Sequence, residues 1–126
     1  MEQKINLPHE HSDTLSQQHI FEAMPSEEAI QVVSHALGQL GDPSRLRIFW
    51  LLCHTEECVA DIAAYVKMSS PAVSHHLRLL KSAGLVVSRR DGKEMLYQAA
   101  DSRLAGELHQ IIERIAEISC PDSGMA

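Results

Sequence analysis

Apolar residues recur at steps of three and four along most of the chain, and this spacing predicts amphipathic helices. One helix is expected over 26–40, and a second over 43–52 is apolar nearly all round and should therefore be central and buried. Two short helices are expected over 59–66 and 69–83, joined by a tight turn. The chain is therefore predicted to be mainly α-helical.

The pattern then changes to two strand-like runs that flank Asp91-Gly92. Asp-Gly between such runs favours a type I′ hairpin, because both turn positions need positive φ. In that register Arg89 faces Glu94, a favourable cross-strand pair. Two short helices followed directly by a small β-hairpin predict a winged helix-turn-helix of order α-α-α-α-β-β-α.

The last helix is expected to begin at Asp101 or Ser102 and to run to about Ser119. It carries an apolar heptad seam made of Leu104, Leu108, Ile111, Ile115 and Ile118. Such a seam favours a homodimer held by the N- and C-terminal helices, and packing within the same domain is the alternative. We expect an N-terminal arm over 1–25 with at most a short helix, the winged domain over 26–120 and a tail over 121–126.

The helix over 69–83 carries small residues in its first turn, then donors and cations, on the face opposite its apolar stripe. Such a helix suits the DNA major groove, because its first turn must approach base edges and its flanks must meet phosphates. The hairpin tip adds further cations. The expected DNA-binding residues are Ser70, Ser74, His75, His76, Arg78, Lys81, Arg89, Arg90 and Lys93. Solvated helices are the alternative, but they do not account for the hairpin.

The net charge of −6 conceals a basic segment. Residues 67–93 hold six basic residues and one acidic residue, a balance of +5, while the chain on either side is acidic. A local basic patch can bind DNA phosphates and so supply the salt-dependent part of the binding free energy. The acidic remainder of the chain limits nonspecific binding. The predicted partner is double-stranded DNA, with a pseudo-palindromic operator if the protein is a homodimer.

Other classes of function find little support in the residues. The sequence contains no glycine-rich phosphate loop, nucleophile elbow or HExxH pattern, so we expect no enzyme. No apolar run is long enough for a membrane span, the first residues are unlike a signal peptide, and an odd number of cysteines argues for reduced thiols, so a cytoplasmic protein is expected. A winged-helix protein-interaction module remains an alternative.

These features together resemble the ArsR/SmtB family of bacterial winged-helix metal sensors, over roughly 26–120. The resemblance is carried by LGDPSRLRI (40–48), ECVADIA (57–63), SSPAVSHHLRLLKSAGLV (69–86) and RRDGKEMLYQAAD (89–101). It implies a homodimeric repressor that leaves its operator when an inducer binds. His76 stands where the family usually has Gln, which changes the expected base preference.

The resemblance also implies a metal or metalloid ion as inducer, with zinc, cadmium, lead and arsenite as candidates. One family site lies on the last helix and uses two histidines. Arg103 and Arg114 occupy those positions here, and a guanidinium cannot donate a lone pair. That site is therefore predicted to be absent.

A second family site matches Cys58 and Asp61, which lie one helical turn apart on the same face. His9 and His11 of the N-terminal arm could complete a site of Cys/Asp/His₂ type, suited to zinc or a similar ion. The alternative for these two histidines is a solvated tail.

A third possibility collects the thiols of Cys53, Cys58 and Cys120, which would suit arsenite, cadmium or lead better than zinc. Cys53 also continues a buried stripe, so an inert core thiol is its alternative role. Some relatives instead pair two thiols to sense persulfide or oxidants. Cys53 and Cys120 are the candidates for that alternative.

Overall fold

The structure is a computed structural model that describes residues 5–9 and 14–117. Its contacts divide into two units, residues 1–31 and residues 32–126, and the division falls inside a helix. The domain boundaries expected after residues 25 and 120 therefore stay predictions.

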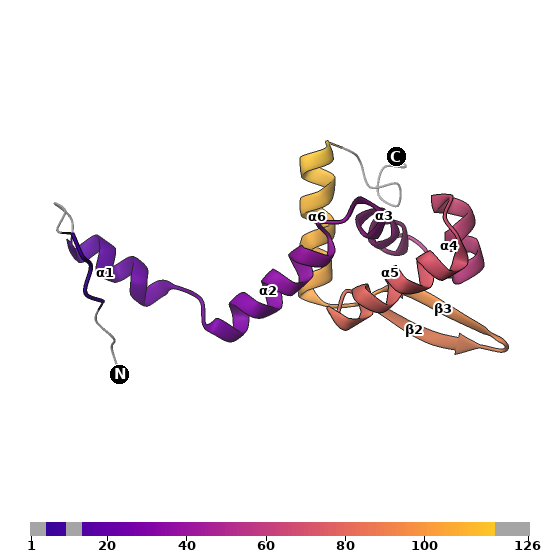
Figure 1. The fold of residues 1–126 in the computed structure, drawn as a ribbon, viewed down its shortest axis with the longest axis horizontal. Helices are drawn as coiled ribbons and strands as arrows, with labels where there is room; N and C mark the ends of the chain where they lie inside the picture. Colours follow the sequence, from indigo (N-terminus) through magenta and orange to yellow (C-terminus); the bar gives the residue numbers. More distant parts are fainter. Residues whose placement is uncertain (1–4, 10–13, 118–126) are drawn as a thin grey trace, which may run out of the picture. The chain divides into compact units, whose positions relative to one another are not determined.

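Six helices and three short strands make up the described chain (Figure 1), so a mainly α-helical fold with a small β-hairpin is confirmed. Their order is α1 (Thr14–Ala23), α2 (Glu27–Gln39), α3 (Pro43–Leu52), β1 (Glu57–Cys58), α4 (Val59–Val66), α5 (Ser70–Ser82), β2 (Val86–Asp91), β3 (Glu94–Ala99) and α6 (Arg103–Ala116). No helix among the described residues has the length and apolar character that crossing a membrane would require.

Four of the helices begin at residues whose side chains satisfy the exposed N–H groups of the first turn. Ser26, Asp42, Ser69 and Ser102 each accept a hydrogen bond from the backbone N–H three residues later, at 3.1–3.4 Å. Such caps each stabilise a helix by about 1 kcal/mol. They explain why the predicted starts of α2, α3, α5 and α6 are close to the observed ones.

The hydrophobic core lies in the unit formed by residues 32–126, with α3 at its centre. Ile48 and Phe49 are 0% exposed, so the prediction of a central buried α3 is confirmed. The other fully buried large side chains come from α4, α5 and the start of the hairpin: Ile62, Val73, Leu77, Leu80, Leu85 and Val86. The helix-turn-helix is thus held by the apolar stripes that its spacing predicts.

The sheet differs from the prediction in its turn, its register and its strand number. Asp91 pairs with Glu94, and Arg89 lies opposite Leu96, so the expected Arg89–Glu94 pair is wrong. The turn residues are Gly92 and Lys93, and only Gly92 has positive φ, at 63°, as in a type II′ turn. This register avoids a left-handed Asp91, which the type I′ turn would require at a cost of about 1–2 kcal/mol.

The third strand was not predicted, because two residues are too few to show a period. Strand β1 adds to the hairpin in the order β1-β3-β2. Its residues Glu57 and Cys58 pair with Tyr97 and Leu96. The start of the helix-turn-helix is therefore joined to the wing by backbone pairing.

The seam expected on α6 divides into two parts. Leu108 is buried in the core of its own chain, and Ile112, which lies outside the seam, packs against the same core. Ile111 and Ile115 are 45% and 79% exposed, while Ile118 lies outside the described residues. The first half of the seam thus follows the alternative of packing within one domain, and the second half remains uncovered in a single chain.

Candidate nucleic-acid interface and metal centre

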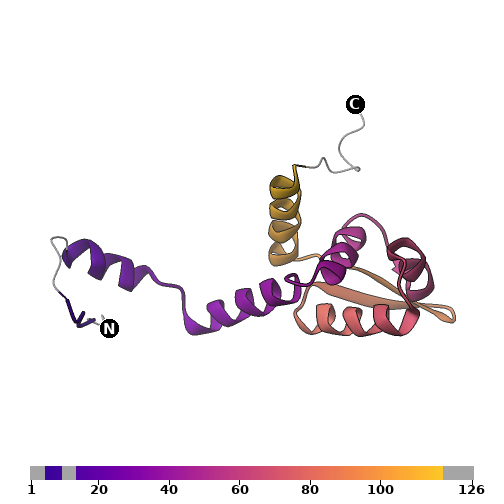
Figure 2. The same cartoon turned by 45° about the horizontal axis from the view of Figure 1, so that its top comes forward.

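One face of α5 is exposed and polar. Ser70, Ser74, His75, Arg78 and Lys81 are all exposed, and the apolar stripe on the opposite side of the helix is buried. Figures 1 and 2 show the β2–β3 hairpin running beside this helix, with its tip projecting beyond the helices. We call α5 and this hairpin the reading surface.

Contacts of the side chains hold the two parts of the reading surface together. Lys81 Nζ donates a hydrogen bond of 2.7 Å to Ser88 Oγ, which joins the end of α5 to β2. At the tip, Arg90 and Lys93 are both exposed, beside the exposed carboxylates of Asp91 and Glu94. The surface therefore offers small residues and donors on α5 and cations on both elements.

Arg89 has an acidic partner within its own chain. Its Nε and Nη2 donate to the two carboxylate oxygens of Glu56 at 2.8 and 2.7 Å. The hydrogen bond from Arg89 lowers the pKa of Glu56, against the opposing effect of burial. The charge of Arg89 is thus largely neutralised locally, and its role in DNA binding stays a prediction.

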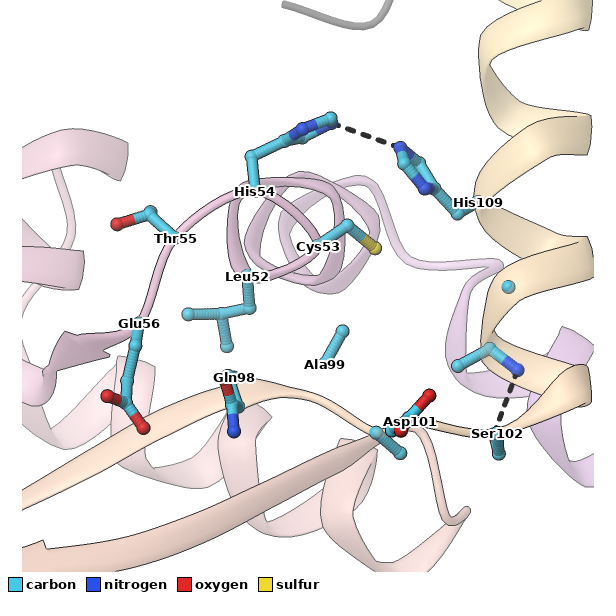
Figure 3. A pocket seen from close by; sticks show the side chains of 13 residues that line it. Leu52, Cys53, His54, Thr55, Glu56, Gln98, Ala99, Asp101, Ser102 and His109 are labelled. Carbon is cyan, nitrogen blue, oxygen red and sulfur yellow. Dashed lines mark hydrogen bonds between the residues drawn. The ribbon is translucent and has the colours of Figure 1, made fainter. Parts of the chain in front are cut away.

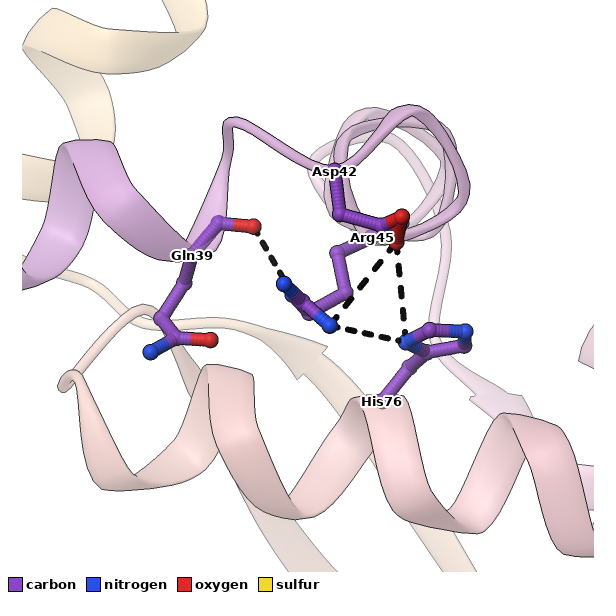
Figure 4. Close-up of polar contacts among 4 residues, drawn as sticks. All are labelled: Gln39, Asp42, Arg45 and His76. Carbon is purple, nitrogen blue, oxygen red and sulfur yellow. Dashed lines mark hydrogen bonds and ion pairs between the residues drawn. The ribbon is translucent and has the colours of Figure 1, made fainter.

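His76 does not share the outward face of α5. Its side chain is 14% exposed, and its Nδ1 lies 3.3 Å from Arg45 Nη1 and 3.9 Å from a carboxylate oxygen of Asp42 (Figure 4). Arg45 also donates through Nε to the carbonyl oxygen of Gln39 at 2.9 Å. Burial lowers the pKa of His76, although the charge of Asp42 opposes this. The structure places His76 in the contact between α5 and the start of α3, away from the expected base-reading face.

The structure leaves the expected metal ligands scattered. Cys58 is half-buried at the N-terminus of α4, and Asp61 is exposed one turn later. Within residues 32–117 no third His, Cys, Asp or Glu donor joins this pair to form a three-donor group. His9 belongs to the other unit, residues 1–31, while His11 and Cys120 lie outside the described residues.

Cys53 packs against the core, in line with its alternative role as an inert core thiol. It also lines a cavity of about 420 Å³. Figure 3 shows its sulfur directed towards α6. The cavity is lined by residues that follow α3, the end of β3 and the start of α6. His54 and His109 are among the residues that line it.

Three side chains that were not predicted as ligands converge between the end of α3 and α6. His54 Nε2 and His109 Nε2 are 3.0 Å apart (Figure 3). Glu113 Oε2 lies 3.3 and 3.1 Å from these two atoms. The three side chains are only 8%, 20% and 12% exposed. We call His54, His109 and Glu113 the α3–α6 cluster.

Trp50, the single tryptophan of the chain, belongs to the surroundings of this cluster. Its Nε1 donates to Glu113 Oε2 at 3.1 Å, and its ring centroid lies 4.6 Å from that of His54. Burial raises the pKa of Glu113, but hydrogen bonds from Trp50, His109 and His54 together lower it below its ordinary value. The carboxylate is therefore held in its ionised, electron-donating form.

One part of this cluster has a sequence signal and the other has none. His109 and Glu113 are four residues apart, which places both on one face of a helix. His54 is 55 residues away from His109, so only the packing of α3 against α6 brings it there. A search for His and Glu at helical spacing would have found two of these three side chains.

Comparison with known proteins identifies relatives of the whole winged domain. The family model described as "Bacterial regulatory protein, arsR family" matches residues 42–88. A transcriptional repressor SmtB homolog of Synechocystis sp. is 38% identical, over 76% of this chain and 72% of its own length. The transcriptional repressor SmtB of Mycobacterium tuberculosis is 33% identical, over 86% of this chain and 78% of its own length.

Two further comparisons extend this picture. A CadC homolog of Staphylococcus aureus, named as a cadmium resistance regulator, is 34% identical over 65% of each chain. The homodimeric winged helix-turn-helix DNA-binding domain of a possible ArsR-family regulator from Mycobacterium bovis is 30% identical. It covers 75% of this chain and 90% of its own, with a TM-score of 0.66.

The fold and the reading surface define a winged helix-turn-helix transcription regulator, a class without catalytic activity. The chain belongs to the arsR family of bacterial regulatory proteins. The resemblance drawn from its sequence motifs is thereby confirmed.

Proposed function

We propose that this protein is a sequence-specific DNA-binding repressor that a thiophilic metal or metalloid ion releases from its operator, with zinc, cadmium, lead and arsenite as the candidate ions. The observation that carries the proposal is the reading surface. It presents an exposed row of small and cationic side chains on α5, beside a cationic hairpin tip, in a chain whose net charge is −6. We expect the protein to act in the cytoplasm.

Each part of the reading surface has a distinct role in this proposal. Ser70 and Ser74 are small enough to let the first turn of α5 approach base edges in the major groove, where His75 adds a further donor. Arg78 and Lys81 then meet phosphates that flank the groove. The wing places Arg90 and Lys93 on the adjacent backbone.

We propose that the protein binds DNA as a homodimer on a pseudo-palindromic site. Support comes from apolar side chains that a single chain leaves uncovered: Val33 and Leu37 of α2 are 46% and 51% exposed, like Ile111 and Ile115 of α6. Covering such residues removes apolar area from water, at about 25 cal/mol per Å². The homodimeric relative from Mycobacterium bovis supports the same assembly. Two reading surfaces about one helical turn apart would then match two half-sites.

Release by a metal ion is proposed as thermodynamic linkage. The CadC homolog is named for cadmium resistance, which supports an ion as the effector. An ion that prefers the form with poorly placed reading surfaces lowers DNA affinity, and DNA lowers affinity for the ion by the same factor. A coupling of about 1–3 kcal/mol changes affinity roughly 5–150-fold. Of the candidate ligands expected from the sequence, Cys58 and Asp61 would hold the ion at the start of α4.

The proposal is tested by titrating the full-length chain onto fluorescent duplexes selected from a random pool, first at low and then at rising salt. Selective binding that weakens as salt rises is expected, and the absence of salt-sensitive binding would favour an interaction module instead. Zinc, cadmium, lead, arsenite and a persulfide donor are then added separately to the complex. Release by an ion supports the proposed function, whereas release by the persulfide donor alone supports the thiol alternative that uses Cys53 and Cys120.

A further inference from the structure

The α3–α6 cluster has a geometry that hydrogen bonds alone do not satisfy. Its three donor atoms form a triangle with sides of 3.0, 3.1 and 3.3 Å. Each imidazole Nε2 carries either a hydrogen or a lone pair, and the ionised carboxylate carries no hydrogen. If both histidines donate to Glu113, the two Nε2 atoms face each other as donors. If one donates to the other, the accepting Nε2 carries a lone pair, and no further hydrogen is left for the two sides that meet Glu113.

A metal cation satisfies all three atoms at once, because each then contributes a lone pair. Zinc binds histidine nitrogen and carboxylate oxygen at about 2.0–2.2 Å. A point about 2.0–2.1 Å from all three atoms of this triangle lies roughly 1 Å outside its plane, as in a tetrahedral site that has one open corner. Little or no movement of the side chains is therefore needed to bind an ion.

The surroundings of the cluster also suit a metal site. Ligating carboxylates are commonly fixed by an outer hydrogen bond, and the Trp50 indole supplies one to Glu113 at 3.1 Å. The side chain of His54 is 8% exposed, so the ligands lie in a medium that screens charge less than water does. One oxygen of Glu113 can accept the indole hydrogen with one lone pair and bind an ion with the other.

We propose that His54, His109 and Glu113 form a binding site for a first-row divalent cation, with Zn²⁺ as the best fit and water as its fourth ligand. The choice of ion follows from the donors, since two imidazoles and a carboxylate suit zinc and its neighbours. Cadmium, lead and arsenite favour thiolates, which this site lacks. The three ligands come from one chain, within residues 32–117.

The position of the site indicates how it would act, and this part of the inference rests on the proposed function. His54 comes directly after α3 and shortly before β1 and α4, while His109 and Glu113 belong to α6. An ion bound here fastens the last helix to the segment that leads into the helix-turn-helix. Ion binding therefore biases the placement of the reading surface relative to α6, which carries the uncovered Ile111 and Ile115.

Trp50 makes the site directly observable, because the only indole of the chain lies against His54 and Glu113. The full-length protein is titrated with Zn²⁺ while tryptophan emission is recorded, and affinity is confirmed by competition with a chromophoric chelator. The wild type is expected to change its emission and to saturate at a stoichiometry of one ion per chain. His109→Ala and Glu113→Gln should each weaken Zn²⁺ binding by more than tenfold, since loss of an outer partner alone typically costs 10–100-fold.

His35→Ala provides the matched control, because it removes an exposed histidine of α2. This variant should bind Zn²⁺ like the wild type. Glu113→Gln is the milder of the two variants, because the glutamine keeps an oxygen that can accept the hydrogen bond from Trp50. It therefore tests the site even if His109→Ala does not fold. Thermal unfolding shows whether each variant is folded. If both variants fold and bind Zn²⁺ as tightly as the wild type, the site is refuted.

Replacing Zn²⁺ by Co²⁺ tests the donor set independently. Nitrogen and oxygen ligands give visible d–d absorption without a sulfur-to-metal band in the near ultraviolet. A strong sulfur band that Cys58→Ser abolishes would assign the ion to the thiol site and overturn the inference. A spectrum free of that band, and lost in His109→Ala, supports it.

Adding DNA separates this inference from the proposed function. Zn²⁺ binding at the cluster without any effect on DNA affinity supports the metal site and contradicts release by this ion. DNA release that persists in His109→Ala and is lost in Cys58→Ser supports the proposed function and contradicts the cluster as its sensor. Loss of zinc-dependent release in His109→Ala but not in His35→Ala supports both.

Discussion

The reading surface and the α3–α6 cluster differ in how their residues come together. The outward residues of α5 and the wing lie within one continuous segment, from Ser70 to Lys93, and they are exposed. The cluster joins His54 to two residues that lie 55 and 59 positions later in the chain, and it is mostly shielded from water. The first surface is suited to a large, charged partner, and the second to a small ion. Variants should therefore affect one function and spare the other.

The largest effect is expected from removing the charges at the wing tip. Arg90→Ala combined with Lys93→Ala should lower DNA affinity roughly tenfold per charge at low salt, because each phosphate contact contributes about 0.9 to the slope of log affinity against log salt. All sequences should be affected alike, with a smaller salt slope. Measurement is by fluorescence anisotropy. Arg103→Ala with Arg114→Ala removes the same charge from exposed positions on α6 and is the matched control.

The Zn²⁺ affinity of the wing-tip variant should equal that of the wild type, because the cluster shares no residue with the wing. A selective change in sequence preference would contradict the assignment of these side chains to phosphates. A loss of zinc affinity would mean that the two regions are not separable.

The next effect comes from the cluster. Trp50→Phe removes the hydrogen bond to Glu113 Oε2 and should weaken Zn²⁺ binding roughly 10–100-fold, as measured by chelator competition. DNA affinity in the absence of metal should stay unchanged. Unaltered zinc affinity in a folded Trp50→Phe variant would show that the indole does not fix the carboxylate.

A smaller effect is expected from the wing turn. Gly92 has a φ of 63°, and no atom lies within 4 Å of the position that a Cβ would take, so Gly92→Ala meets conformational strain without a steric clash. The expected loss is about 1–3 kcal/mol in the free energy of unfolding, measured by urea denaturation. Gly84 also has positive φ, and no atom lies within 4 Å of the position of its Cβ, so Gly84→Ala should lower the free energy of unfolding by a comparable amount. A neutral Gly92→Ala would contradict the type II′ turn.

The smallest effect concerns pH and the contact between α5 and α3. Because burial holds the pKa of His76 below its ordinary 6.5, the folded state resists a proton that the unfolded state accepts. Its stabilising contribution is therefore present above about pH 6.5 and is lost as pH falls through the lowered pKa of the folded state. Asp42, Arg45 and His75 are the charged or titratable groups that act on it.

His76→Gln should remove this dependence, so its stability should decline less than that of the wild type between about pH 7.5 and about pH 5.5. The urea midpoint at each pH measures it. His35→Gln, which removes an exposed histidine of α2 that is not among these groups, is the control and should follow the wild type. Parallel curves for His76→Gln and the wild type would mean that burial of this ring does not affect its protonation.

These regions also show how far sequence reasoning reaches. Helix starts were predictable because a cap such as Ser69 acts within three residues, and the buried stripe of α5 follows from its own spacing. The orientation of His76 was not, because it depends on Arg45 in another helix. The partner of Arg89 is Glu56, which lies 33 residues away, so local pairing rules pointed to the wrong acid.

The candidate ligands divide in the same way. Cys58 and Asp61 were found from a motif, and the structure joins no third donor to them within residues 32–117. The three donor atoms of the α3–α6 cluster lie close together, but no sequence motif contains all three residues. Its two ligands on α6 carry the helical spacing of four residues, and the third is supplied only by tertiary packing. Contact between distant segments is the information that a single sequence lacks.

The short strand β1 has a mechanical consequence. Because Cys58 pairs with Leu96 in the middle of the wing, and Glu57 with Tyr97, the hairpin cannot swing freely while α4 stays still. The Glu56–Arg89 ion pair also links the residue before β1 to β2. We therefore expect the wing and α4 to move together when the loop after α3 is displaced.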